Sequence, residues 1–294
     1  MTQALKPLFI IGAGRSGTNI LRDVLTSLPG TITWPCDEIN LVFRHGNRSM
    51  PHDEFGPEQV NDTARKYIVS TFKKLARSGK PPLPTIVEKT CANSLRVPFL
   101  NEIFPDARYI FIFRNGYDVT SSALIRWRSS IEPEYLYQKL KFVPVTDIPY
   151  YAVKFIKNRL HQFNSKEKTQ KQWGPVYDGM MRDLQEIPIE QVVARQWARS
   201  FEKAYQDLSS LGDDKYISLA YEDFVGDPLT ILKKIKEWNS FGWSEEDMQR
   251  AASTVKRSSV NKGRKNLDKE IIERISAEIE PVMNHIYMKL RPEN

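Results

Sequence analysis

The chain has 294 residues, and its 43 Lys and Arg against 36 Asp and Glu give a formal net charge of +7. This length allows one large domain or two small ones, and the positive charge suits an anionic ligand. The cations are scattered without a basic tail, so nucleic-acid binding is not expected. Two cysteines, Cys36 and Cys91, are too few for a disulfide framework and lack metal-ligand spacing with the four histidines, so we expect no metal.

The amino-terminal residues lead within a few positions into the first expected strand. They contain no signal-peptide pattern, and no stretch approaches the roughly 18 consecutive apolar residues of a membrane span. We therefore expect a cytoplasmic protein without a membrane-spanning segment. The sequence does not indicate an oligomeric state.

The first expected element is an apolar strand at residues 8–12, which leads into a glycine-rich turn that opens a helix. Gly12, Gly14 and Gly17 have no Cβ, so backbone amides in this turn can approach an anion closely. The amino terminus of the following helix adds partial positive charge. These features predict a phosphate-binding loop.

Two known loop patterns compete for this segment. Gly12 and Gly17 have the spacing of the nucleoside-triphosphate loop, but Thr18 follows where that loop has a lysine. Gly12, Gly14 and Gly17 also match the dinucleotide fingerprint, which needs an acidic residue after the second strand. The run at residues 31–34 is a poor second strand because it is short and ends at a proline.

An NAD- or FAD-binding oxidoreductase therefore stays open as an alternative, with Asp37 or Glu38 as the acidic residue. A non-catalytic nucleotide-binding protein is the other alternative, since a phosphate loop by itself carries no chemistry.

Further short apolar strands are expected at residues 85–89, 109–113 and 216–220, separated by helical patterns. This alternation predicts a three-layer α/β/α fold with a central parallel sheet covered on both faces. We expect one domain over residues 1–294. Long packing helices are expected from residue 189 and over residues 271–286.

Residues 126–188 interrupt the alternation with prolines, aromatic residues and cations. We interpret this segment as a helical insertion that binds an acceptor substrate. A plain surface excursion is the alternative, because aromatic residues at helical spacing more often pack than bind a ligand.

A second charged position follows the strand at residues 109–113. Arg114 ends this strand, and Ser122 lies eight residues later in the expected helix. A guanidinium offers a planar, permanently charged fork to phosphate oxygens, and a hydroxyl fills a remaining acceptor position. This pair is a candidate phosphate-binding site.

The run Gly14-Arg15-Ser16-Gly17-Thr18 resembles the 5′-phosphosulfate loop of sulfotransferases that use 3′-phosphoadenosine 5′-phosphosulfate (PAPS). In that family an Arg at a strand end and a Ser two turns into the next helix bind the nucleotide 3′-phosphate, as Arg114 and Ser122 would here. The chain resembles the tyrosylprotein sulfotransferases and the broad bacterial sulfotransferase family.

The resemblance also implies the catalytic residues. Cys36-Asp37-Glu38 stands where those enzymes have Cys-Gly-Glu, which makes Glu38 the base; His45 and Asp37 are the alternatives. Lys89 ends a strand whose terminal Lys stabilises the transferring group in the family, and Arg15 would share that role.

The implied donor-binding residues come from four parts of the chain. The loop at residues 260–264 has the order Lys-Gly-Arg where many members have Arg-Lys-Gly, so either Lys262 or Arg264 would contact the 3′-phosphate. Tyr221 is interpreted first as a structural residue. The full set is Gly14, Arg15, Ser16, Gly17, Thr18, Asn19, Arg114, Ser122, Tyr221, Asn261, Lys262, Gly263 and Arg264.

The resemblance therefore implies a metal-free enzyme that moves a sulfuryl group from PAPS to a hydroxyl or amine. A small molecule, a saccharide, a lipid or a peptide could be the acceptor.

Overall fold

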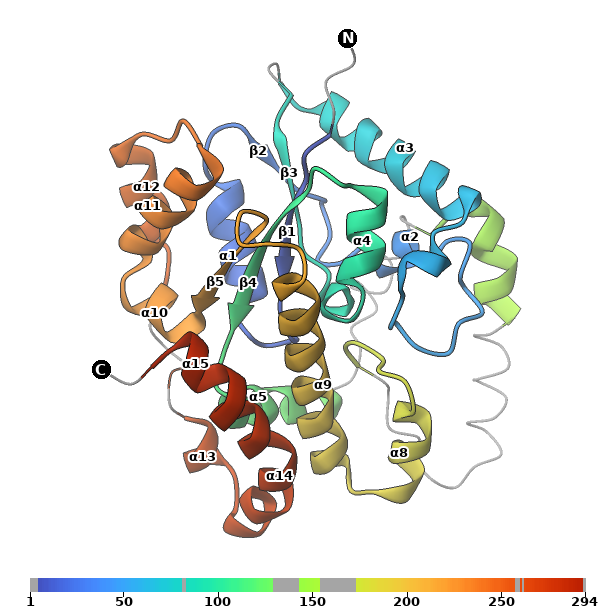
Figure 1. Cartoon of the computed structure of the whole chain (residues 1–294), viewed down its shortest axis with the longest axis vertical. Coiled ribbons are helices and arrows are strands. Elements are labelled where there is room, and N and C mark those ends of the chain that lie inside the picture. The colour runs from blue at the N-terminus through green and yellow to red at the C-terminus, as the bar shows by residue number, and fades with distance from the viewer. Residues whose placement is uncertain are drawn as a thin grey trace.

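A computed structural model of the chain describes residues 5–80, 83–128, 143–153, 173–256, 260 and 262–292. Its centre is a sheet of five parallel strands in the order β2-β3-β1-β4-β5 (Figure 1). The strands are β1 (Leu8–Ile11), β2 (Thr31–Ile32), β3 (Thr85–Glu88), β4 (Arg108–Phe113) and β5 (Tyr216–Ala220). The predicted parallel α/β sheet is confirmed.

Alternating side chains of the central strands supply both hydrophobic cores. On one face, Phe9 of β1 stacks on Tyr109 of β4, with ring centroids 5.6 Å apart. On the other face lie Leu8 and Ile10 of β1 with Ile110 and Ile112 of β4. Successive residues of a strand point to opposite faces, so a strand that is apolar throughout is covered on both sides.

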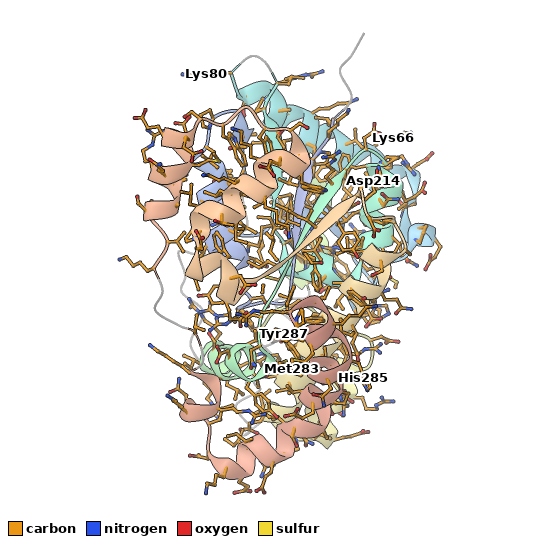
Figure 2. The ribbon with its side chains drawn as sticks, turned by 60° about the vertical axis from the view of Figure 1, so that its left-hand side comes forward. Lys66, Lys80, Asp214, Met283, His285 and Tyr287 are labelled. Atoms are coloured by element: carbon orange, nitrogen blue, oxygen red, sulfur yellow. The ribbon has the colours of Figure 1, made fainter. Side chains whose placement is uncertain are left out.

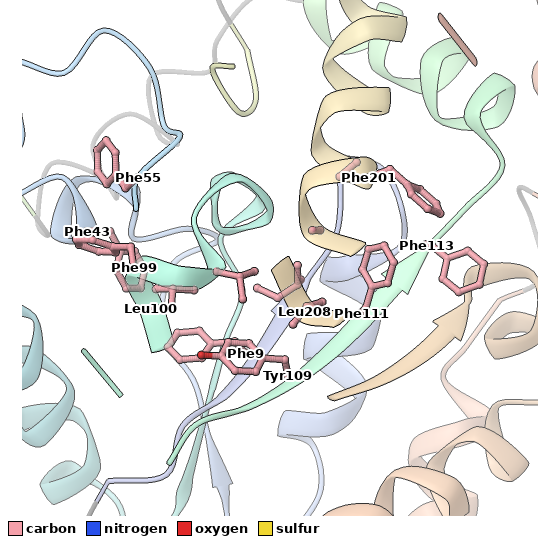
Figure 3. Close-up of a cluster of buried hydrophobic side chains, with 14 of the residues drawn as sticks. Phe9, Phe43, Phe55, Phe99, Leu100, Tyr109, Phe111, Phe113, Phe201 and Leu208 are labelled. Atoms are coloured by element: carbon pink, nitrogen blue, oxygen red, sulfur yellow. The ribbon is translucent and has the colours of Figure 1, made fainter. Parts of the chain in front are cut away.

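The helices on the Phe9 face enclose the larger core. Figure 3 shows its aromatic side chains, which include Phe43, Phe99, Phe111 and Phe201. The helices that contribute to it are α2 (Asn40–Phe43), α3 (Asp62–Ser78), α4 (Val97–Ile103), α9 (Ile189–Ser209) and α14 (Lys269–Val282).

The opposite layer consists of α1 (Thr18–Thr26), α10 (Tyr221–Gly226), α11 (Pro228–Asn239) and α12 (Glu245–Ser253). The indole of Trp243, between α11 and α12, donates a hydrogen bond to the carbonyl of Pro29 at 3.1 Å, which holds this layer against the end of the first helix. Among the described residues, none of the helices is long and apolar enough to cross a membrane.

At the carboxyl end of the sheet lie α5 (Gly116–Arg128), α8 (Met180–Glu186) and α13 (Gly263–Asn266), as Figure 1 shows. Short 3₁₀ turns occur at η1 (Pro57–Gln59), η2 (Cys91–Leu95) and η3 (Val145–Asp147). The predicted insertion at 126–188 begins inside α5, and its residues 129–142 and 154–172 lie outside the described residues.

The carboxyl-terminal helix differs from the single helix expected over residues 271–286. After α14 the chain makes a π-helical turn, η4 (Met283–Tyr287), and then α15 (Met288–Leu290). Pro281 lies in the last turn of α14 and has no N–H to donate, which weakens the regular hydrogen-bond ladder there. Figure 2 shows Tyr287 near the middle of the molecule, close to Met283 and His285, and Lys80 at its upper end.

The order of the strands argues against the dinucleotide-binding alternative. In the dinucleotide fold the second strand lies next to the first, so its terminal acid faces the glycine loop. Here β3 lies between β2 and β1. The acidic residues that follow β2 are therefore not placed as that fold requires.

Candidate active site

A candidate site lies at the carboxyl ends of the strands, and every strand leads to one of its residues. Arg15 follows β1, Glu38 follows β2, Lys89 follows β3, Arg114 follows β4 and Tyr221 follows β5. Ligands of open α/β sheets bind at this edge, because the loops there converge.

The loop after β1 has the conformation of an anion-binding turn. Gly17 is the cap residue of α1 with φ of 90°, and Arg15 also has a positive φ of 74°. This left-handed backbone costs a non-glycine residue about 1 kcal/mol, and such strained positions concentrate at functional sites. A Cβ at Gly17 would collide with the ring of Tyr221, so only glycine fits there.

Trp173 also packs against the loop, a contact that no local motif predicts. A Cβ at Gly14 would lie 2.9 Å from the Trp173 ring. Gln196 of α9 holds the backbone of this tryptophan by donating a hydrogen bond to its carbonyl at 2.9 Å. The end of the predicted acceptor-binding segment is therefore in contact with the phosphate-binding loop.

The two predicted phosphate sites adjoin each other through Arg15. The Nε of Arg15 donates to the Ser122 hydroxyl at 2.9 Å, and Nη1 of Arg114 donates to the Arg15 carbonyl at 3.2 Å. The Arg114 guanidinium also stacks over the Tyr221 ring at 4.3 Å. Residues 15, 114, 122 and 221 thus form one contiguous cluster.

Three arginines, Arg15, Arg114 and Arg126, lie near enough in this cluster for their charges to interact. Burial lowers the pKa of Arg15, and the neighbouring charges of Arg126 and Arg114 lower it further. An anion held here would relieve the mutual repulsion of the three guanidinium groups.

Asp118 links the loop at residues 262–264 to Arg114 through hydrogen bonds. One oxygen accepts a hydrogen bond from Arg114 at 3.3 Å, and the other accepts one from the Gly263 amide at 2.5 Å. Sequence reasoning missed this residue, although it lies four positions after Arg114 at the start of a helix, a spacing that brings side chains together.

The remaining candidates from the carboxyl-terminal loop take different positions. Arg264 stacks on Tyr117 at 4.1 Å and pairs with Glu280 at 2.8 Å. Lys262 is exposed, and Asn261 lies outside the described residues. The choice between Lys262 and Arg264 stays a prediction.

Glu38 and Lys89 form a largely buried ion pair. Nζ of Lys89 lies 3.1 Å from Oε1 of Glu38, and the Cys91 amide donates to the same oxygen at 3.3 Å. Burial alone would lower the pKa of Lys89, but the charge of Glu38 and the hydrogen bond to it, together with the charges of Cys91 and Asp37, outweigh burial and raise the pKa. Lys89 is therefore a permanent cation at this site.

Cys91 is a poor nucleophile in this position. Burial raises the pKa of its thiol to about 12, and the charge of Glu38 contributes. The thiol lies 3.8 Å from the Thr18 hydroxyl, so it joins the loop of β1 to the end of β3. Of the other loop candidates, Ser16 is buried and Asn19 is half-buried.

The alternative bases are engaged with other partners. Asp37 accepts a hydrogen bond from Arg22 at 3.2 Å. His45 is buried, with Nδ1 2.8 Å from Oδ2 of Asp147 in the 143–153 segment. In the part of the chain that the structure describes, no three His, Cys, Asp or Glu side chains gather as metal ligands.

A second carboxylate, Glu88, lies buried directly before Lys89. Burial raises the pKa of Glu88 from 4.5 to about 7, and the charge of Glu38 adds to the rise. A hydrogen bond from Thr90 and the positive charges of Arg96 and Lys89 act in the opposite direction.

This carboxyl makes the stability of the fold depend on pH. The folded protein binds its proton more tightly than the unfolded chain, so the contribution of Glu88 to the free energy of unfolding falls as pH rises from 4.5 to about 7. The fall amounts to about 3 kcal/mol. Glu88→Gln should not show this fall. Between about pH 5 and about pH 8, urea denaturation should therefore show the free energy of unfolding of the variant rising by about 3 kcal/mol relative to that of the wild type. The same difference in free energy of unfolding between variant and wild type at both pH values would contradict this prediction.

Comparisons with known proteins agree on one class. A family model described as "Sulfotransferase family" matches residues 7–245 of the chain. A search of curated proteins found no match.

Solved structures of sulfotransferases share the fold. A sulfotransferase from Alicyclobacillus acidocaldarius is 16% identical with a TM-score of 0.54, over 99% of this chain and 98% of that one. Mouse sulfotransferase SULT7A1, solved with PAP, is 14% identical with a TM-score of 0.51, over 96% and 85%. Retinol dehydratase, solved with androsterone and inactive cofactor PAP, is 13% identical with a TM-score of 0.51, over 96% and 82%.

Proposed function

Since the chain belongs to the sulfotransferase family, we propose that it transfers the sulfuryl group of PAPS to an acceptor hydroxyl or amine by in-line displacement. The product nucleotide is then 3′-phosphoadenosine 5′-phosphate (PAP).

The observation that carries the proposal is that Arg15, a residue of the proposed 5′-phosphosulfate loop, contacts both members of the proposed 3′-phosphate pair. Its side chain contacts Ser122 and its carbonyl contacts Arg114, at 2.9 Å and 3.2 Å. A nucleotide with a sulfated phosphate at its 5′ end and a phosphate at its 3′ position can use both groups at once. A nucleotide without a 3′-phosphate would offer Arg114 no phosphate group at that position.

The donor would be held mainly by charge-assisted hydrogen bonds. The loop amides and the Ser16 and Thr18 hydroxyls would bind the 5′-phosphosulfate, and Arg114 with Ser122 would bind the 3′-phosphate. Charged hydrogen bonds of this kind each contribute about 1.5–3 kcal/mol.

The reaction needs one base and a stabilised leaving group. Glu38 accepts the acceptor's proton while the acceptor oxygen or nitrogen forms a bond to sulfur. The bond between sulfur and the bridging phosphate oxygen breaks, and its electron pair stays on the phosphate. Lys89 and Arg15 stabilise the charge that develops on this oxygen. The Glu38–Lys89 contact of 3.1 Å supports this proposal because it places base and cation together.

The acceptor class is open among small molecules, saccharides, lipids and peptides. One structural neighbour, retinol dehydratase, was solved with the steroid androsterone, which supports small apolar alcohols as the first acceptors to assay.

Calorimetric titration with PAP, 5′-AMP and NAD tests the donor, and transfer of radiolabelled sulfur from PAPS to an acceptor panel tests the reaction. We expect PAP to bind about a hundredfold more tightly than 5′-AMP, since the 3′-phosphate gains at least two charged hydrogen bonds. Equal affinity for PAP and 5′-AMP would contradict the proposal.

A further inference from the structure

Behind the Glu38–Lys89 pair lies a buried hydrogen-bond chain that the proposed reaction does not use. Its centre is Glu88, the last residue of β3, with no exposed surface. The Thr90 hydroxyl donates to one Glu88 oxygen and the Asn93 side-chain amide donates to the other, both at 2.6 Å.

The two ends of this chain favour one direction for the hydrogen bonds within it. At one end the Ile39 backbone amide donates to the Thr90 hydroxyl at 3.1 Å. At the other end Nε of Arg96 donates to the Asn93 carbonyl oxygen at 2.7 Å. A backbone amide and a guanidinium cannot accept, so the Asn93 side-chain amide donates to Glu88, and the Thr90 hydroxyl, which already accepts from Ile39, has Glu88 as the acceptor for its own proton. Both oxygens accept when Glu88 is a carboxylate, whereas a neutral side chain would donate to the second lone pair of Thr90 and leave the Thr90 proton without its acceptor.

Arg96 anchors the far end of the chain. It is fully buried, with its guanidinium 4.8 Å from the Phe43 ring and 5.7 Å from the Phe55 ring. Its Nη1 also lies 3.9 Å from Oδ1 of Asp53, which is buried as well. An arginine so enclosed cannot reorient to follow a change at Glu88.

The near end of the chain holds the segment that carries the proposed base. Ile39 directly follows Glu38, and its amide is fixed by Thr90. Lys89 and Cys91, which flank Thr90, both contact the Glu38 carboxylate. Residues 89–91 thus contact both the Glu38 side chain and the backbone amide that follows it.

We propose that Glu88 is a positioning residue that, through Thr90 and Ile39, fixes Glu38 against Lys89 for proton removal. This inference rests on the function proposed above. It explains why a carboxylate is kept in the core, where an ionised group is costly unless its geometry is used.

The test reverses one hydrogen bond and then restores it. Glu88→Gln keeps the size of the side chain but turns an NH₂ either toward Asn93, which is itself a donor, or toward Thr90, whose hydroxyl proton then loses its acceptor. Adding Asn93→Asp restores the pattern, because the new carboxylate accepts from both Gln and Arg96. We expect Glu88→Gln to lower kcat at least about tenfold, with the Kd for PAP within about twofold, and the double variant to recover most of kcat.

Amide hydrogen exchange supplies a readout independent of turnover. The Ile39 amide should exchange at least about tenfold faster in Glu88→Gln and return toward the wild-type rate in the double variant. A loss of folding alone would also raise exchange throughout the core and would weaken PAP binding. Asn93→Asp alone, which sets two carboxylates together, should resemble Glu88→Gln or be worse.

The outcomes separate this inference from the function on which it rests. A wild-type protein without sulfuryl transfer would refute the proposed function, and unchanged Ile39 exchange in Glu88→Gln would refute the positioning role in either case. If the wild type is active, either of two results would refute the inference and leave the proposed function intact. One is a full kcat in Glu88→Gln, and the other is a kcat in the double variant as low as in Glu88→Gln.

Discussion

Replacement of Glu38 by Gln should lower kcat about a thousandfold while leaving the Kd for PAP nearly unchanged. A positioned general base contributes about a hundredfold to ten-thousandfold to turnover, and the amide cannot take the proton. Gln keeps an oxygen for the contacts that Lys89 and the Cys91 amide make at 3.1 Å and 3.3 Å, so the fold around it should persist. Steady-state kinetics together with PAP calorimetry measure both quantities.

Asp37→Asn and His45→Gln are the matched controls for this prediction. Asp37 is the adjacent carboxylate and is 41% exposed, while His45 is paired with Asp147. Each should keep kcat within a few fold of the wild type. If one control variant lost kcat about a thousandfold and Glu38→Gln kept it, the residue changed in that control would be the base in place of Glu38.

Arg114→Ala should weaken PAP binding at least about a hundredfold and leave the affinity for 5′-AMP within a few fold. The guanidinium is buried at the end of β4, and loss of a buried charged partner typically costs about 2–5 kcal/mol of binding. Because 5′-AMP has no 3′-phosphate, its affinity reports damage to the rest of the site. Calorimetry with both nucleotides gives the comparison.

Arg108→Ala is the control, since Arg108 begins the same strand at the opposite end and hydrogen-bonds the carbonyl of Trp238. It should change neither affinity. An equal loss of PAP and 5′-AMP binding in Arg114→Ala would mean that the arginine supports the loop, through the Arg15 carbonyl, and does not recognise the 3′-phosphate.

The sheet could be predicted from the sequence because its strands are apolar on both faces. Leu8–Ile11 and Arg108–Phe113 alternate between two cores, a pattern that fits buried parallel strands. The order of the strands could not be predicted, because β2 has only two residues and pairs far from its neighbour in sequence. The π-helical turn after Val282 was also missed, since the apolar spacing there continues unchanged.

For the candidate site, local motifs placed residues at strand ends but could not give their contacts. The spacing from Arg114 to Ser122 predicts that both face one ligand, and the structure brings both to Arg15. Nothing local in the sequence connects Trp173 with Gly14, because that contact depends on how the chain returns after the insertion. Glu88 could have been identified from the sequence, because an acidic residue at the end of a buried strand is unusual.

The ring of Tyr221 has a consequence for how this site can change over evolution. It fills the space beside Gly17 and carries the Arg114 guanidinium at 4.3 Å. The three positions share one volume, so the effects of substitutions at them will not add. A smaller residue at 221 would remove the barrier to a side chain at 17, but it would also remove the platform under the arginine. Descendants of this sequence should therefore keep or exchange these three residues as a unit.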